Sequence, residues 1–172
     1  MNYFNELCNA MEMLAEDPRT IFMGQAVAYP GTAMFNTLRD IPMGKRLELP
    51  VAEDMQLGMA LGMSLDGRLP ICMYPRWNFL LLATNQLALH LDKLPLYSKY
   101  RPKVIIRTAV ATPEPLDPGP QHLGDFSNEF QSMLKTIPVI KLYDTEDIMP
   151  AYRQAKERDG STLLVEYTSN YI

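Results

Sequence analysis

Short apolar stretches of strand length alternate with helical patterns along the whole chain. The strand-like stretches lie at 20–23, 47–49, 69–74, 104–108, 139–143 and 162–167. The helical patterns begin near residues 4, 33, 53, 78, 126 and 145. This alternation predicts an α/β domain with a mainly parallel sheet between two helical layers, a three-layer α/β/α architecture. In such a sheet, ligands bind at the carboxyl ends of the strands.

Composition restricts the class of protein. The 172 residues suit a single domain spanning 1–172. A net charge of -4 gives no electrostatic basis for binding nucleic acid or an anionic membrane. Cys8 and Cys72 lie in apolar stretches without CxxC spacing, so we expect reduced core thiols and not a disulfide. With no signal peptide and no apolar run long enough to span a bilayer, a cytoplasmic protein is expected.

The stretch from Leu49 to Gly67 places an acid at the head of an otherwise apolar helix. Glu53 and Asp54 suit its first turn, where the helix dipole favours carboxylates. Methionine and leucine then recur at four-residue spacing, which predicts a helix buried on most sides. Gly58 and Gly62 would let another backbone approach closely. A carboxylate in such a place is costly without a partner or a function, although a solvated helix start is the alternative.

Two further segments that leave strands carry candidate chemistry. In the turn at 74–77, Tyr74 and Trp77 suit a stacking surface for a flat ring, with plain core as the alternative. His122 ends a long proline-rich loop at 109–124, and such loops are usually functional or mobile. It could serve as a movable acid or base near neutral pH, or be an exposed loop histidine. No Walker loop, GxGxxG, GxSxG or zinc spacing is found, so no metal ligands are predicted.

The almost wholly apolar helix predicted at 78–94 should be covered on most sides, by this chain or by another one. It completes an ordered set of segments that carry a resemblance to a known family. These segments lie at 17–24, 49–53, 58–62, 67–71, 78–79, 85–86 and 121–122. Together they resemble the pyrimidine-binding domain of thiamine-diphosphate-dependent enzymes. The resemblance is greatest to the N-terminal domain of the beta subunit of 2-oxoacid dehydrogenase E1 components, and transketolase is more distant.

The resemblance implies roles for particular side chains. Glu53 matches the carboxylate that hydrogen-bonds and activates the aminopyrimidine ring of the cofactor. Tyr74 and Trp77 match the region whose aromatic side chains pack on that ring, and His122 matches a histidine near the substrate carbonyl. Gln25 stands where the family has an acid after the first strand. That exchange, with Leu123 where the family has serine, departs from the family pattern.

The resemblance also implies a partner. Residues 1–172 match neither the diphosphate-binding domain nor the transketolase C-terminal domain. We therefore expect an E1 alpha-like chain to hold the diphosphate of thiamine diphosphate and Mg²⁺ in a hetero-oligomer such as a heterotetramer. The expected reaction is carbon–carbon cleavage or transfer on a 2-oxo acid. The alternatives are transketolase-like ketol transfer on a ketose, a non-catalytic interaction or regulatory subunit, and a flavodoxin-like small-molecule binder.

Overall fold

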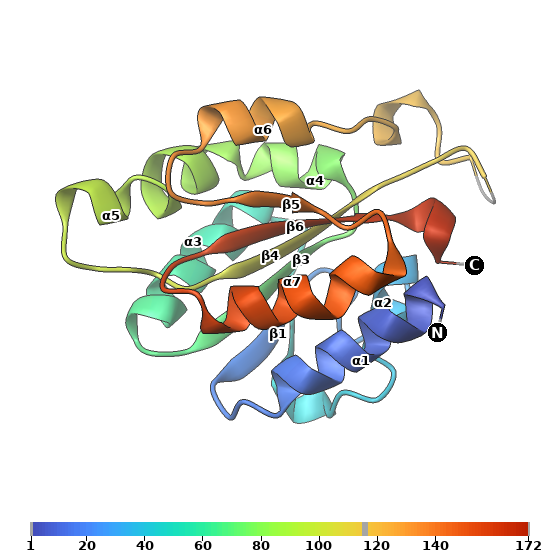
Figure 1. Ribbon diagram of the computed structural model, residues 1–172, viewed down its shortest axis with the longest axis horizontal. Coiled ribbons are helices and arrows are strands. Elements are labelled where there is room, and N and C mark those ends of the chain that lie inside the picture. Colours follow the sequence, from blue (N-terminus) through green and yellow to red (C-terminus); the bar gives the residue numbers. More distant parts are fainter. Residues whose placement is uncertain (1, 115–116, 172) are drawn as a thin grey trace.

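A single parallel sheet organises the chain. The computed structural model describes residues 2–114 and 117–171. The strands are β1 (Thr20–Gly24), β2 (Arg46–Glu48), β3 (Leu69–Tyr74), β4 (Ile105–Val110), β5 (Val139–Lys141) and β6 (Thr162–Tyr167). They form a six-stranded sheet in the order β2-β1-β3-β4-β6-β5, and every neighbouring pair is parallel (Figure 1). The expected α/β fold with a parallel sheet is confirmed.

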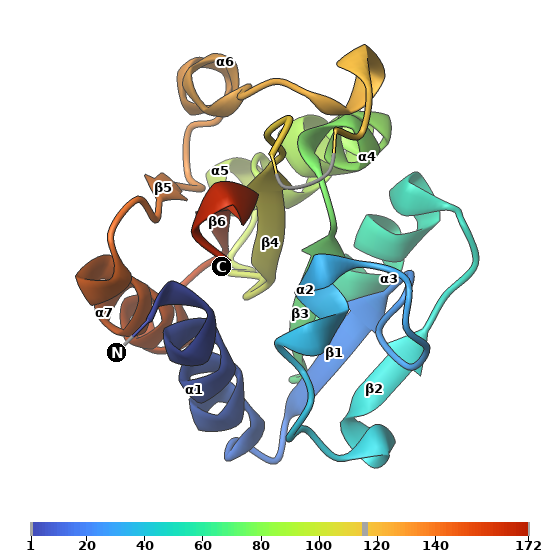
Figure 2. The same ribbon diagram turned by 90° about the vertical axis from the view of Figure 1, so that its right-hand side faces the viewer.

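Helices cover both faces of the sheet (Figure 2). One layer contains α1 (Tyr3–Ala15), α2 (Ala33–Asn36) and α7 (Thr145–Glu157). The other contains α3 (Glu53–Leu65), α4 (Trp77–Leu82), the π-helix η2 (Gln86–Leu91) and α6 (Ser127–Met133). The remaining short segments are η1 (Met43–Lys45), α5 (Leu94–Tyr97), η3 (Pro120–His122) and η4 (Thr168–Asn170). Every described helix is too short or too polar to cross a membrane.

The most continuous apolar stretches of the sequence form the central strands of the sheet. All residues of β3, β4 and β6 are buried, as expected for strands covered on both faces. Their side chains alternate between two hydrophobic cores, one on each side of the sheet. Cys8 and Cys72 are buried free thiols, as the sequence predicted.

The helix expected at 78–94 is interrupted. Helix α4 ends at Leu82, and η2 begins at Gln86 with a wider turn. At the break, the Thr84 hydroxyl donates to the carbonyl oxygen of Leu81 at 2.6 Å. A threonine that bonds to the preceding turn competes with the helical ladder and bends helices. The helical pattern expected to begin near residue 145 is confirmed by α7, whose N-cap is Asp144.

Two helices that were expected to be buried on most sides expose an apolar face. On α3, Met55 is 43% exposed, and the place where a Cβ of Gly62 would lie has no described neighbour within 4 Å. A Cβ at Gly58 would contact the Gln86 side chain at 3.6 Å, so no other backbone uses these glycines within the described chain. In the segment from α4 to η2, Leu82 is 62% exposed. This chain alone leaves that side of both helices uncovered, and the expected coverage of the 78–94 segment by another chain stays a prediction.

Candidate functional site

Glu53 is the first residue of α3, at the carboxyl edge of the sheet. Its side chain is largely buried, with 8% of the residue exposed. No hydrogen bond or ion pair joins its carboxylate to another described residue. The N-cap residue Ala52 supplies no side-chain hydrogen bond, so the helix dipole is the local feature that favours a carboxylate here. A buried acid without a donor is costly, and a ligand that brings an N–H group would satisfy it.

Tyr74, the last residue of β3, fixes the position of Glu53. Its hydroxyl donates to the backbone carbonyl oxygen of Glu53 at 3.0 Å. Burial raises the pKa of Tyr74 well above its ordinary value, and the nearby Cys72 and Glu53 add to this effect. The phenol therefore stays protonated and keeps donating. Because the Tyr74 ring is buried, its predicted contact with a cofactor ring stays a prediction.

Gln56 fastens α3 to the sheet at the point where the chain reverses its direction across the strands. The chain leaves β1 toward β2 and leaves β3 toward β4, so a crevice is expected between β1 and β3. The buried Gln56 amide donates to the carbonyl oxygens of Met23 at 3.3 Å and Met73 at 3.1 Å. Gly24 makes this approach possible, because a Cβ there would lie 3.1 Å from Nε2 of Gln56 and 2.6 Å from the Met73 carbonyl oxygen.

Glu48 holds the loop that carries Gln25. Its carboxylate accepts the backbone N–H groups of Ala26 at 2.7 Å, Val27 at 2.8 Å and Ala28 at 2.7 Å. Gln25 directly follows β1 and is partly buried. An acid therefore lies close to Gln25, but the backbone uses both of its oxygens. The role of Gln25 in holding a cofactor stays a prediction.

Trp77 is buried beneath α6. Its ring lies 5.0 Å from the ring of Phe130 and 6.2 Å from that of Phe126, measured between centroids. Its indole N–H has no hydrogen-bond partner among the described residues. Since aromatic side chains of this chain already contact the indole, its predicted stacking on a cofactor stays untested. Phe79, two residues later on α4, is only partly buried.

His122 lies beside α4, which also contacts the Glu53 helix. The imidazole pairs with the ring of Phe79 at a centroid distance of 5.9 Å. Its Nδ1 is buried and has no hydrogen-bond partner within the described chain. Helix α4 thus contacts both the helix that begins with Glu53 and the segment that ends with His122. Within 2–114 and 117–171, no group of three or more His, Cys, Asp or Glu side chains could hold a metal ion.

Two positioning residues escaped the sequence analysis. Gln56 gave one signal, since it is a polar residue three positions after Glu53 on what became the buried face of the helix. Glu48 ends a short strand and resembles a solvated acid in sequence, because its partners are backbone groups more than twenty positions away. Backbone donors carry no sequence signature, so this contact needed the structure.

Comparisons with known proteins agree with this geometry. No protein-family model matches the chain. The pyruvate dehydrogenase E1 component subunit beta of Cyanidium caldarium is 26% identical over 137 residues, which cover 76% of this chain and 40% of that protein. A solved split-gene transketolase, an inactive beta4 tetramer, has a TM-score of 0.69 at 16% identity, over 95% of this chain and 49% of the other. A proposed thiamin diphosphate-dependent enzyme from Mycobacterium smegmatis also has a TM-score of 0.69, at 17% identity, over 95% and 31%.

The chain resembles thiamine-diphosphate-dependent enzymes in sequence and shares their fold. The likeness to the solved structures establishes the fold, and the likeness to the E1 beta subunit supports a pyrimidine-binding type of domain. The chain spans only 40% of the length of the curated relative that it matches.

Proposed function

We propose that this chain supplies the aminopyrimidine pocket of a thiamine-diphosphate enzyme and acts together with a second polypeptide. The observation that carries this proposal is Glu53, a buried carboxylate without a described partner at the first position of α3. Its place beside the crevice between β1 and β3 suits a small-molecule ligand. A buried carboxylate without a hydrogen-bond donor is better explained by binding to the cofactor ring than by a purely structural role.

The residues of this chain have separable tasks in the proposed site. Glu53 holds a proton shared with a ring nitrogen, and Tyr74 fixes the backbone that carries the carboxylate. His122 exchanges a proton near the substrate carbonyl, and no hydrogen bond within the described chain occupies its Nδ1. When bound, thiamine diphosphate supplies the carbanion stabilisation that carbon–carbon cleavage beside a carbonyl requires.

The partner chain holds the diphosphate and Mg²⁺ in this proposal. It covers the apolar surface of α3, α4 and η2, where Met55, Leu82 and Leu89 are 43%, 62% and 58% exposed. Exposed apolar patches on folded domains commonly mark interfaces. The inactive state of the solved beta4 tetramer of split-gene transketolase supports the idea that such a chain needs a second subunit.

A 2-oxo acid is the proposed substrate, because a relative with detectable sequence similarity is a pyruvate dehydrogenase subunit. Ketol transfer on a sugar is the competing reaction, and the transketolase likeness supports it at the level of the fold. The two differ in the donor molecule and leave the proposed role of Glu53 unchanged.

Co-expression with a diphosphate-binding chain tests the proposal. We expect thiamine diphosphate binding and 2-oxo acid turnover by the pair, and a loss of turnover of about 100-fold or more in Glu53→Gln. Asp54→Asn is the matched control, since it removes the neighbouring, exposed acid from the same helical turn. Unchanged turnover in Glu53→Gln would disprove the assigned role. Co-purification with the partner but no turnover on either donor class would favour an interaction subunit.

A further inference from the structure

A cavity whose lining includes neither Glu53 nor His122 lies at the carboxyl edge of the sheet. Its volume is about 430 Å³, within the range of small-molecule sites. The segments that line it follow β1, β3, β4 and β6, so it is built from strand-exit loops. Its described lining residues are Gly31, Thr32, Ala33, Arg76, Ala111, Thr112, Glu114, Pro118, Thr168 and Tyr171. Neither predicted catalytic residue belongs to this set.

Arg76 is the one basic side chain among those lining residues. It occupies the N-cap of α4, directly after the turn that leaves β3, and it is partly buried. No hydrogen bond or ion pair connects its guanidinium to another described residue. Glu114 also lines the cavity, but it is exposed and forms no ion pair with Arg76. A guanidinium offers a planar fork of donors that matches carboxylate and phosphate oxygens, so this cavity presents an unused anion-binding group.

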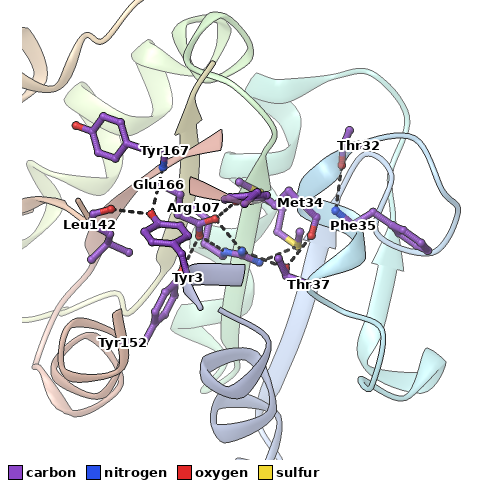
Figure 3. A network of polar contacts seen from close by, with 12 residues as sticks. Tyr3, Thr32, Met34, Phe35, Thr37, Arg107, Leu142, Tyr152, Glu166 and Tyr167 are labelled. Atoms are coloured by element: carbon purple, nitrogen blue, oxygen red, sulfur yellow. Dashed lines mark hydrogen bonds and ion pairs between the residues drawn. The ribbon is translucent and has the colours of Figure 1, made fainter. Parts of the chain in front are cut away.

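Thr32 offers a second donor. Its Oγ1 accepts the backbone N–H of Phe35 at 3.1 Å, as Figure 3 shows, so its own proton remains available to a ligand. The other threonines of the cavity have already used theirs. Thr112 donates to the carbonyl oxygen of Glu114 at 2.7 Å, and Thr168 donates to that of Val110 at 3.2 Å.

A buried ion pair holds two walls of this cavity in place. Arg107 and Glu166 form a bidentate pair, with Nε–Oε1 at 2.7 Å and Nη2–Oε2 at 3.0 Å (Figure 3). Arg107 also donates to Thr37 Oγ1 at 3.2 Å, which fixes the end of α2 whose first turn lines the cavity. On the other side, the Tyr171 hydroxyl donates to the carboxylate of Glu166. The cavity is thus preorganised, which lowers the entropy lost on binding.

We propose that this cavity is an anion subsite, in which Arg76 and Thr32 bind the carboxylate or phosphate group of a small organic molecule. The anion site stands on the geometry of this chain alone. Its assignment as the place where the charged end of the substrate binds rests on the proposed function. A carboxylate would match a 2-oxo acid, and a phosphate would match a sugar phosphate.

Titration of the isolated chain, followed by protein NMR, tests the site without cofactor or partner. The probes are pyruvate and inorganic phosphate. We expect saturable shifts at residues lining the cavity, and affinity about tenfold weaker in Arg76→Gln. Arg68→Gln is the control, because Arg68 is exposed in the turn before β3. Glu114→Gln should bind anions slightly more tightly, since it removes a nearby negative charge.

The outcomes separate the sources of the anion. Binding of pyruvate alone supports a carboxylate site, binding of phosphate alone supports a phosphate site, and Arg76-dependent binding of both supports a general anion site. Absence of binding to the folded wild-type chain overturns the proposal, as does equal affinity in wild type and Arg76→Gln. If anions bind through Arg76 while Glu53→Gln leaves turnover unchanged, the anion site stands and the proposed cofactor role falls.

Discussion

Arg107 and Glu166 place opposite charges on the adjacent strands β4 and β6, and both residues are 0% exposed. Charges in such a position are stable only as a pair, because each would otherwise lack solvation. The pair also organises polar groups around it, since Tyr152 donates to Glu166 and Thr37 accepts from Arg107. The pair and its polar partners form a buried cluster in the core, and their hydrogen bonds also hold segments that line the cavity.

Breaking this pair on one side should destabilise the fold strongly. We expect Arg107→Met to lower the free energy of unfolding by about 3–5 kcal/mol, because it leaves the Glu166 carboxylate buried and unpaired. The double variant Arg107→Met with Glu166→Leu should recover most of that loss. Urea denaturation followed by circular dichroism measures both values. Arg153→Met, on the exposed side of α7, is the control, and an effect no larger than this control would contradict the expectation.

At the residue scale, the sequence located Glu53 correctly at a helix start, because the helix dipole and proline punctuation act locally. It did not locate Gln56 or Glu48, whose partners are carbonyl and N–H groups of distant backbone. The sequence also gave no role to Arg76. That side chain stands out because no described residue bonds to its guanidinium, and only the structure shows this.

Among the elements, Asp92 joins the end of η2 to the segment between α6 and β5. Its carboxylate is fully buried and accepts the backbone N–H groups of Lys135 at 2.9 Å, Thr136 at 2.7 Å and Ile137 at 3.1 Å. It also forms an ion pair with Lys93. These acceptor contacts tie the end of η2 to the segment that leads from α6 into the edge strand β5.

The stabilisation from Asp92 should depend on pH. Burial acts to raise its pKa, but the hydrogen bonds from Lys93 and the backbone at 135–137 outweigh burial and hold the pKa below its ordinary value of 3.8. A carboxyl with a lowered pKa stabilises the fold fully above its unfolded pKa, and that contribution is lost as the pH falls through the folded pKa. We expect Asp92→Asn to lower the free energy of unfolding by about 2 kcal/mol near neutral pH.

The same variant should lose less stability than wild type on acidification. Urea midpoints measured from neutral pH down to acid conditions check this difference in slope. Asp66→Asn, in the exposed turn after α3, is the control and should follow wild type. Parallel pH profiles of wild type and Asp92→Asn would contradict the assignment.

Helix boundaries show where local patterns stop being sufficient. The period of apolar residues at 78–94 predicts a helix but cannot reveal a change from an α-turn to a π-turn, because leucines fill most of the circumference and leave no single face to mark the shift. The break depends on Thr84 and on packing against α3. By contrast, β3 and β6 have their predicted bounds, because continuous burial and flanking turns fix both ends.

For the whole molecule, the exposed leucines of α4 and η2 bear on assembly. Leu82 and Leu89 are more than half exposed. We expect Leu82→Glu with Leu89→Glu to abolish co-purification with the proposed partner, while the free energy of unfolding changes by less than about 1 kcal/mol. Size-exclusion chromatography with light scattering measures the assembly. Met43→Glu, an exposed apolar residue on η1, should leave assembly intact, and an intact complex in the double variant would exclude this surface.

At this largest scale, the alternation of elements predicted the parallel sheet and its two helical layers. It did not predict the strand order or which helices stay partly uncovered. Strand order depends on the directions of the crossover connections, which leave no local sequence pattern. An apolar helix face has the same sequence pattern whether this chain or another chain covers it. The apolar residues on α3 show this ambiguity, since Leu57 is buried inside the chain and Met55 is exposed.

The contacts of Tyr3 impose an order of events during synthesis. Its hydroxyl donates to the carbonyl oxygen of Leu142 at 2.6 Å and accepts the backbone N–H of Tyr167 at 3.2 Å. Helix α1 leaves the ribosome long before β6 exists, so the face that packs against α7 stays uncovered until that helix has been translated. Pairings between segments so distant in sequence form slowly. We therefore expect this face of α1 to be accessible to chaperones and proteases while the intervening residues are being made.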